Sequence, residues 1–178
     1  MSNTSINFWH ERTSILDFIT DGRPQILGKG RTTSEHINRL ERMQHAEGRH
    51  FYAVTITFHD KTLRRRGLHM PKVPECQFRF ISPHIESDFK GFDYCFWTEW
   101  TKNGMIHFHG VISHKTIHIS NSLILHSVRT ILSNKYGKMN ANSSAVNDVT
   151  DFRKFLDYCS KEDNHILSNI FDDSESNS

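Results

Sequence analysis

Short runs of aromatic and β-branched residues, separated by polar turn residues, fill the middle of the chain. Two of these runs, residues 92–100 and 105–113, flank Lys102-Asn103-Gly104, and such a turn between two hydrophobic runs is a strong hairpin signal. A third run, residues 51–58, has almost no polar interruption, which is typical of a strand in the centre of a sheet. We therefore predict a β-hairpin and a separate central strand.

Hydrophobic positions three and four residues apart predict three helices. The first begins at Ser34, which can cap it, and ends before Gly48. The second covers residues 121–136, and the third covers residues 148–163 with Asp148 as its cap. The hydrophobic positions on these helices are Ile37, Leu40, Met43, Leu123, Ile124, Val128, Ile131, Leu132, Phe152, Phe155, Leu156 and Cys159.

Three further segments are interpreted from their composition. Residues 59–74 are rich in arginine, glycine and proline and are predicted to be a loop. Residues 77–81 are predicted to be an edge strand, and residues 143–147 a last short strand. Together these elements indicate an α+β fold of the ferredoxin-like kind, in which helices pack on one face of an antiparallel sheet of about five strands.

The length of 178 residues suits one domain, which we place at residues 51–165. Residues 1–50 are predicted to be a partly helical N-terminal extension without chemistry, in which His36 is solvated. Residues 166–178 follow as a C-terminal tail. Because this tail becomes acidic and rich in serine, we expect it to be mostly disordered.

Charge and cysteine content narrow the possible classes of protein. The formal net charge is only +2, but residues 61–66 hold four basic side chains, which suit either phosphate groups or a solvated loop. The three cysteines, Cys76, Cys95 and Cys159, have neither disulfide-framework nor zinc-site spacing, which suits a reducing compartment. Because no signal peptide or long apolar run is evident, we expect a soluble intracellular protein with no membrane partner.

Two histidines in the second strand of the hairpin, His107 and His109, are two residues apart and therefore share one face of the sheet. Glu99 precedes the turn and lies beside them on the paired strand if the register allows. Two imidazole nitrogens and one carboxylate oxygen can hold one divalent ion. The alternative is an ordinary polar face, since the chain contains 13 histidines.

A second pair of polar residues lies on the last predicted helix. Tyr158 and Lys161 are three residues apart and flank the hydrophobic stripe of that helix. The tyrosine ring can then be held by packing while its hydroxyl faces a groove. For this pair taken alone, a partly buried tyrosine next to a surface lysine is the simpler interpretation.

Taken in order, these segments resemble the three motifs of the HUH endonucleases, the replication-initiator (Rep) proteins of rolling-circle plasmids and small single-stranded DNA viruses. Thr55-Ile-Thr57 matches the first motif, His107-Phe-His109 the second and Tyr158-x-x-Lys161 the third. The resemblance covers residues 51–163 and is specific because the motifs occur in this order on an antiparallel sheet. Since no helicase domain follows, we expect either a nuclease fragment or a small initiator that uses a separate helicase.

The resemblance implies a site-specific endonuclease and strand transferase, with one Mn²⁺ or Mg²⁺ ion on Glu99, His107 and His109. Tyr158 would attack the DNA phosphate and leave a 5′-phosphotyrosine link and a free 3′-OH, while Lys161 supplies positive charge. Basic and aromatic side chains are expected to contact the DNA, namely Lys61, Arg64, Arg65, Arg66, Trp97, Trp100 and Phe108.

The implied partners are a single-stranded replication origin, expected to form a stem-loop, and a host or viral helicase. The protein would act in the host nucleus if its source is a eukaryotic virus, and in the cytoplasm if its source is a bacterial replicon. Two other functions stay open. One is a non-catalytic module that binds single-stranded nucleic acid on the same kind of sheet, and the other is a relaxase or transposase with the same chemistry.

Overall fold

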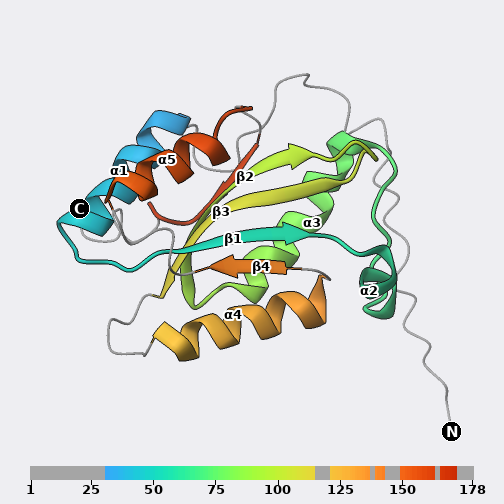
Figure 1. Ribbon diagram of the computed structural model, residues 1–178. Coiled ribbons are helices and arrows are strands. Elements are labelled where there is room, and N and C mark those ends of the chain that lie inside the picture. Colours follow the sequence, from blue (N-terminus) through green and yellow to red (C-terminus); the bar gives the residue numbers. More distant parts are fainter. Residues whose placement is uncertain (1–30, 115–120, 137–138, 143–148, 163–164, 172–178) are drawn as a thin grey trace, which may run out of the picture.

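The structure, a computed structural model, describes residues 31–114, 121–136, 139–142, 149–162 and 165–171 (Figure 1). Its centre is a sheet of five antiparallel strands in the order β4-β1-β3-β2-β5. The strands are β1 (Tyr52–Thr57), β2 (Phe92–Trp100), β3 (Ile106–His114), β4 (Met139–Asn142) and β5 (Ile166–Ser168). The predicted α+β fold with an antiparallel sheet of about five strands is confirmed.

The connections between the strands explain their order in the sheet. Helix α3 (Pro74–Asp88) connects β1 to the β2–β3 hairpin, and helix α4 (Asn121–Lys135) connects the hairpin to β4. Because β4 pairs with the free side of β1, the core of the fold has the β-α-β-β-α-β order of the ferredoxin-like type. The short strand β5 then extends the sheet by pairing with the outer edge of β2.

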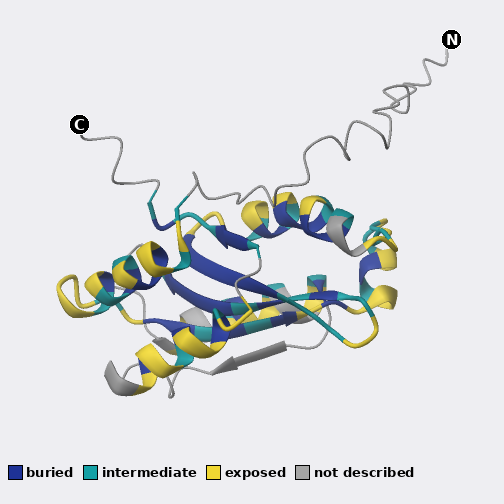
Figure 2. Ribbon diagram, turned by 90° about the horizontal axis from the view of Figure 1, so that it is seen from above, coloured by how far each residue is buried: buried dark blue, intermediate teal, exposed yellow. Residues whose placement is uncertain are grey.

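Helices cover both faces of the sheet (Figures 1 and 2). The prediction that helices pack on one face only is therefore wrong. Helices α3 and α4 pack on one face, which we call the α3 face. Helices α1 (Thr33–His45) and α5 (Val149–Cys159) pack on the other, the α5 face, to which strand residues Ala53, Cys95, Trp97 and Val111 belong. Among the described residues, no helix combines the length and the apolar character needed to span a bilayer.

The predicted edge strand at residues 77–81 is wrong, because these residues lie inside α3. Pro83 also lies inside this helix, although proline normally interrupts one. The hydrophobic positions of α3 follow helical spacing and pack into the core of the α3 face. These buried positions are Phe78, Ile81, Ile85 and Phe89.

Part of the predicted loop at residues 59–74 is also helical. Helix α2 (Asp60–Arg65) follows β1 directly, and the backbone N–H of Leu63 donates to the carbonyl oxygen of His59 over 3.0 Å. Leu63 is fully buried in the core of the α3 face. The other side chains of this short helix are exposed or partly exposed.

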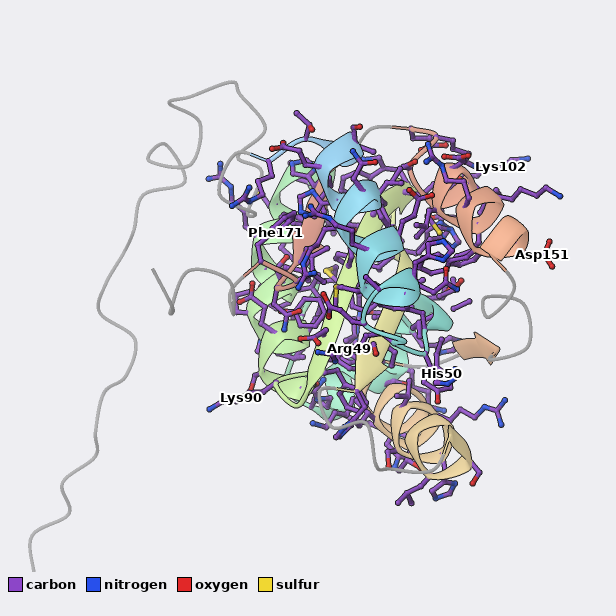
Figure 3. All side chains as sticks on the ribbon, turned by 90° about the vertical axis from the view of Figure 1, so that its left-hand side faces the viewer. Arg49, His50, Lys90, Lys102, Asp151 and Phe171 are labelled. Atoms are coloured by element: carbon purple, nitrogen blue, oxygen red, sulfur yellow. The ribbon has the colours of Figure 1, made fainter. Side chains whose placement is uncertain are left out.

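Both ends of the described chain belong to the core, which corrects the predicted extension and tail. In α1, His36 is fully buried and not solvated, and its ring packs edge-on against Phe171 with 5.1 Å between centroids. Phe171 lies beside α1 (Figure 3). Ile166 and Leu167 are buried in β5. The apolar start of the predicted tail, up to Phe171, therefore belongs to the core. The rest of the tail, for which disorder is predicted, and the predicted strand at residues 143–147 lie outside the described residues.

Gly110 occupies a point on β3 where the backbone of β2 comes very close. A Cβ atom at this position would lie 2.0 Å from the carbonyl oxygen of Cys95 and 2.8 Å from Cα of Phe96. Because both are backbone atoms of the paired strand, a side chain could enter only if the hairpin opened. Only glycine therefore fits between His109 and Val111.

Gly110→Ala should lower the free energy of unfolding by at least about 2 kcal/mol, because the added methyl group overpacks this contact. Chemical denaturation measures the change. Gly91→Ala is the control, since a Cβ atom at Gly91 meets no atom within 4 Å. Equal stability of the two variants would show that the strands are not so close.

Candidate metal centre

The β2–β3 hairpin brings the three candidate metal ligands onto the α5 face. Glu99 pairs directly with His107, and Trp97 pairs with His109, so the ligands occupy two alternate rungs of one ladder, with the Thr98–Phe108 rung between them. The turn between the strands contains Gly104, whose φ of 71° is readily adopted only by glycine. The register left open by the sequence is the one that places Glu99 beside both histidines.

Three donor atoms converge in what we call the ligand triad, formed by Glu99, His107 and His109. The Nε2 atoms of His107 and His109 lie 2.9 and 2.8 Å from Oε2 of Glu99, and 2.9 Å from each other. Neighbouring ligand atoms about 2.1 Å from one octahedral ion are about 3.0 Å apart. The triad has this spacing, and among the described residues it is the one such group of three histidine, cysteine or acidic side chains.

The electrostatics of the triad favour the protonation states that metal ligands need. Hydrogen bonding to His107, and then to Lys161 and His109, lowers the pKa of Glu99 to about 2. Burial, and after it the charge of His107, lowers the pKa of His109 from its usual value. At pH 7 Glu99 is therefore ionised and His109 is neutral, as metal ligation requires.

Thr55 on β1 orients the imidazole of His109. Its Oγ1 lies 3.0 Å from Nδ1 of His109, and the two residues are direct partners in the β1–β3 ladder. A proton on Nδ1 that is donated to this hydroxyl leaves the lone pair on Nε2, which faces Glu99 and His107. The neighbouring strand thus holds the ring with Nε2 towards the other two ligands, and the Thr55 hydroxyl can accept from Nδ1–H in the tautomer that binds a metal ion.

Thr55→Val should weaken Mn²⁺ binding about tenfold, because valine keeps the shape of threonine but cannot accept the hydrogen bond from His109. Thr55→Ser keeps the hydroxyl group and should bind Mn²⁺ nearly as well as the unaltered protein. Calorimetric titration with Mn²⁺ compares the three proteins. If the valine and serine variants bound Mn²⁺ equally well, Thr55 would have no part in orienting His109.

Tyr158 lies next to the triad in the last turn of α5. The hydrophobic stripe predicted for this helix faces the core, where Phe152, Leu156 and Cys159 are buried. Tyr158 itself is 50% exposed, and its ring is edge-on to that of His109 with 5.8 Å between the centroids. The fold therefore brings together two candidate groups that are far apart in the sequence.

Lys161 connects the tyrosine to the triad. Its Nζ lies 3.3 Å from Oε1 of Glu99 and 4.7 Å from the centre of the Tyr158 ring. Helix α5 ends at Cys159, earlier than predicted, so Lys161 lies in the turn that follows the helix. The hydrogen bond to Glu99 raises the pKa of Lys161, which keeps the ammonium group charged beside the phenol.

Three of the four basic residues expected to contact DNA are exposed on α2. Lys61 and Arg65 extend into solvent, and Arg64 is exposed although its guanidinium lies 2.9 Å from the carboxylate of Asp60. An ion pair between exposed groups contributes little to stability and breaks at little cost. All three side chains can therefore turn towards a phosphate group.

Arg66, the fourth basic residue, makes contacts within the protein, and its expected contact with DNA stays a prediction. Its guanidinium lies 3.6 Å from the carboxylate of Asp88 and 5.1 Å from the centre of the Tyr136 ring. It also donates to the carbonyl oxygen of Lys135 over 3.3 Å. Since Asp88 ends α3 and Lys135 ends α4, Arg66 holds α2 against the ends of these two helices.

The aromatic residues expected to stack on DNA bases belong to the two cores. Trp97 is 1% exposed between the sheet and helices α1 and α5, and Phe108 is fully buried on the α3 face. Trp100 is partly exposed but packs against the core of the α3 face, on the opposite side of the sheet from the triad. Burial therefore contradicts base stacking by Trp97 and Phe108, whereas the contact expected of Trp100 stays a prediction.

The candidate site thus contains the ligand triad, the phenol of Tyr158 and the ammonium group of Lys161. These groups can hold a divalent ion beside a hydroxyl nucleophile, on a sheet of ferredoxin-like topology. Their chemistry is interpreted from this geometry and from the order of the motifs. No protein-family model, curated protein or solved structure matches the chain.

Proposed function

We propose that this protein is a metal-dependent endonuclease that cuts single-stranded DNA at a specific site and links itself to the product through Tyr158. The observation that carries the proposal is the position of the Tyr158 phenol beside the ligand triad, with Lys161 in contact with both. The ferredoxin-like strand order and the three motifs that resemble those of HUH endonucleases support it. Initiation of rolling-circle replication is the corresponding biological role.

Glu99, His107 and His109 would hold one divalent ion, either Mn²⁺ or Mg²⁺. Their donor atoms have the spacing of neighbouring octahedral ligands, and the imidazole nitrogens favour Mn²⁺ over Mg²⁺. When bound, the ion supplies positive charge that neutralises and orients the scissile phosphate. Because the contact with Thr55 holds the ring of His109, the ligand set is arranged before the ion arrives.

The reaction that the residues of this chain would carry out is a transesterification. Oη of Tyr158 forms a bond to phosphorus, and the bond from phosphorus to the 3′ oxygen of the preceding nucleotide breaks. The phenol proton passes to solvent, and the departing 3′ oxygen takes up a proton to give a free 3′-OH. Lys161 stabilises the negative charge that develops on the phenol oxygen.

The basic side chains of α2 would bind phosphates of the same DNA strand. Thr57, at the end of β1, pairs with His107, and α2 begins shortly after Thr57, so the helix leaves the sheet at the end that carries the triad. Exposed lysine and arginine side chains there bind a DNA backbone without reading its sequence. We propose a stem-loop origin and a host or viral helicase as partners.

A non-catalytic nucleic-acid-binding module is less well supported. Such a module on a ferredoxin-like sheet binds bases on exposed aromatic side chains, whereas Trp97 and Phe108 are buried here. It also has no need for a carboxylate between two imidazoles. A relaxase or transposase would use the same site and chemistry, and it differs in the DNA that it cuts.

Capture of DNA in a covalent complex tests the proposal. The protein is incubated with Mn²⁺ and a pool of single-stranded oligonucleotides of random sequence, labelled at the 3′ end so that the label stays with the piece that joins Tyr158. A labelled protein band that survives SDS is expected, and EDTA should prevent its formation. If the pool yields no covalent band under any divalent metal, the binding-module function replaces the endonuclease.

A further inference from the structure

A buried glutamine on α3 contacts the hairpin directly behind the ligand triad. Gln77 is 1% exposed. Its Nε2 donates to the carbonyl oxygen of Gly104 over 2.9 Å, and its Oε1 accepts from the backbone N–H of Ile106 over 2.8 Å. One side-chain amide thus satisfies a carbonyl and an N–H two residues apart, as the N–H and C=O of one residue in a parallel strand would.

The contact lies where the pairing between β1 and β3 stops. The register of these strands extends to Thr57 and His107, so Ile106 is the first residue of β3 beyond it. A buried backbone N–H without a partner is costly, and Gln77 provides that partner from the helix below. The glutamine therefore takes the place of one more residue of β1 at the end of the hairpin.

This end of the hairpin determines where two of the three ligands lie. Ile106 directly precedes His107 and pairs with Trp100, which directly follows Glu99. A shift of the Trp100–Ile106 rung would therefore also shift the adjacent Glu99–His107 rung. Metal ligands tolerate little displacement, because bond lengths and directions to the ion are narrowly defined.

We propose that Gln77 is a positioning residue for the metal centre. By holding Gly104 and Ile106, it keeps Glu99 and His107 in the geometry that binds a divalent ion. Gln77 contacts neither the ligand side chains nor the substrate, so its effect passes through the backbone of the hairpin. This inference rests on the proposed function, because it requires that the triad binds metal.

Gln77→Met tests the inference, because methionine preserves length and volume but removes both hydrogen bonds. Mn²⁺ binding, followed by calorimetry and by the EPR signal of the bound ion, should weaken roughly tenfold. Ser82→Ala is the matched control. Ser82 lies on the same helix with the same burial and donates to the Phe78 carbonyl oxygen within α3, so its loss should leave Mn²⁺ affinity unchanged.

The outcomes separate this inference from the proposed function. Absence of Mn²⁺ binding by the unaltered protein overturns both. Normal binding by the unaltered protein, together with equal binding by Gln77→Met, overturns the positioning role alone. Weak binding by Gln77→Met with full binding by Ser82→Ala supports it.

A measurement on the unaltered protein decides the matter if Gln77→Met does not fold. Coupling between two sites is reciprocal. If the hydrogen bonds of Gln77 to the hairpin favour metal binding, metal binding must in turn stabilise these hydrogen bonds. Saturating Mg²⁺ should slow hydrogen exchange of the Ile106 amide about tenfold. The Asn169 amide, which donates to the carbonyl oxygen of Tyr94 at the β5 edge, should not change. Unchanged exchange at Ile106 overturns the inference.

Discussion

Tyr158→Phe should abolish covalent joining to DNA while leaving metal binding and DNA binding nearly unchanged. The substitution removes the oxygen that attacks phosphorus and keeps the ring, which is half-exposed and edge-on to His109. Loss of an enzyme's nucleophile typically lowers the rate by more than about a thousandfold, and a similar loss of cleavage is expected here. No protein–DNA band should remain visible.

A denaturing gel of the 3′-labelled oligonucleotide measures both cleavage and covalent capture. Ser160→Ala is the control, because Ser160 carries the other hydroxyl of the segment between Tyr158 and Lys161, and its Oγ donates to the carbonyl oxygen of Asp157 over 3.4 Å. This control variant should remain active. Cleavage that survives in Tyr158→Phe and disappears in Ser160→Ala would show that Ser160, and not Tyr158, is the nucleophile.

His107→Ala should lose metal-dependent activity, and added Mn²⁺ should restore it poorly. The substitution removes one of three ligand atoms and also the hydrogen bond that contributes most to the low pKa of Glu99. With two ligands left, Mn²⁺ affinity should fall by about a hundredfold or more. Calorimetric titration and the DNA-joining assay give the two quantities independently.

His126→Ala is the matched control for this prediction, since His126 is an exposed histidine on α4, a helix of the α3 face. It should leave both Mn²⁺ affinity and activity unchanged. If both variants retained the affinity of the unaltered protein, the triad would be a hydrogen-bonded polar cluster and not a metal site.

The hairpin and its ligands could be predicted because short-range rules determine them. Lys102-Asn103-Gly104 specifies a turn, the period of two places His107 and His109 on one face, and a short turn limits which residues can lie opposite Glu99. Helices α1, α4 and α5 could be predicted from spacing alone for the same reason. None of these predictions needed knowledge of distant contacts.

Local rules could not predict that helices α1 and α5 cover the α5 face of the sheet. Trp97 is buried because α1, more than fifty residues earlier in the chain, packs against the same core as α5. The stripe of Ile37, Leu40 and Met43 was a usable signal, since an apolar stripe on a helix must be buried against something. Because that segment is predicted to be an extension, the sequence leaves the α5 face uncovered, and the expected contact of Trp97 with DNA is wrong as a result.

Side-chain contacts between different helices and strands could not be predicted from the sequence either. The sequence places Thr55 in a strand that matches the first motif, but its hydrogen bond to His109 depends on the register of β1 with β3. The sequence predicts an edge strand at residues 77–81, so it gives no sign that Gln77 contacts the hairpin from a helix. Three-dimensional packing, and not residue type, gives these two residues their roles.

The most direct test of whether the ligand triad binds a divalent ion is crystallographic. A crystal of the unaltered protein is soaked in Mn²⁺ and measured at the manganese absorption edge. One anomalous peak is expected between Oε2 of Glu99 and the Nε2 atoms of His107 and His109, about 2.1 Å from each, with the Tyr158 hydroxyl able to reach a phosphate bound to that ion. No peak at the triad at millimolar Mn²⁺, or a peak only at some other group of side chains, would contradict the account.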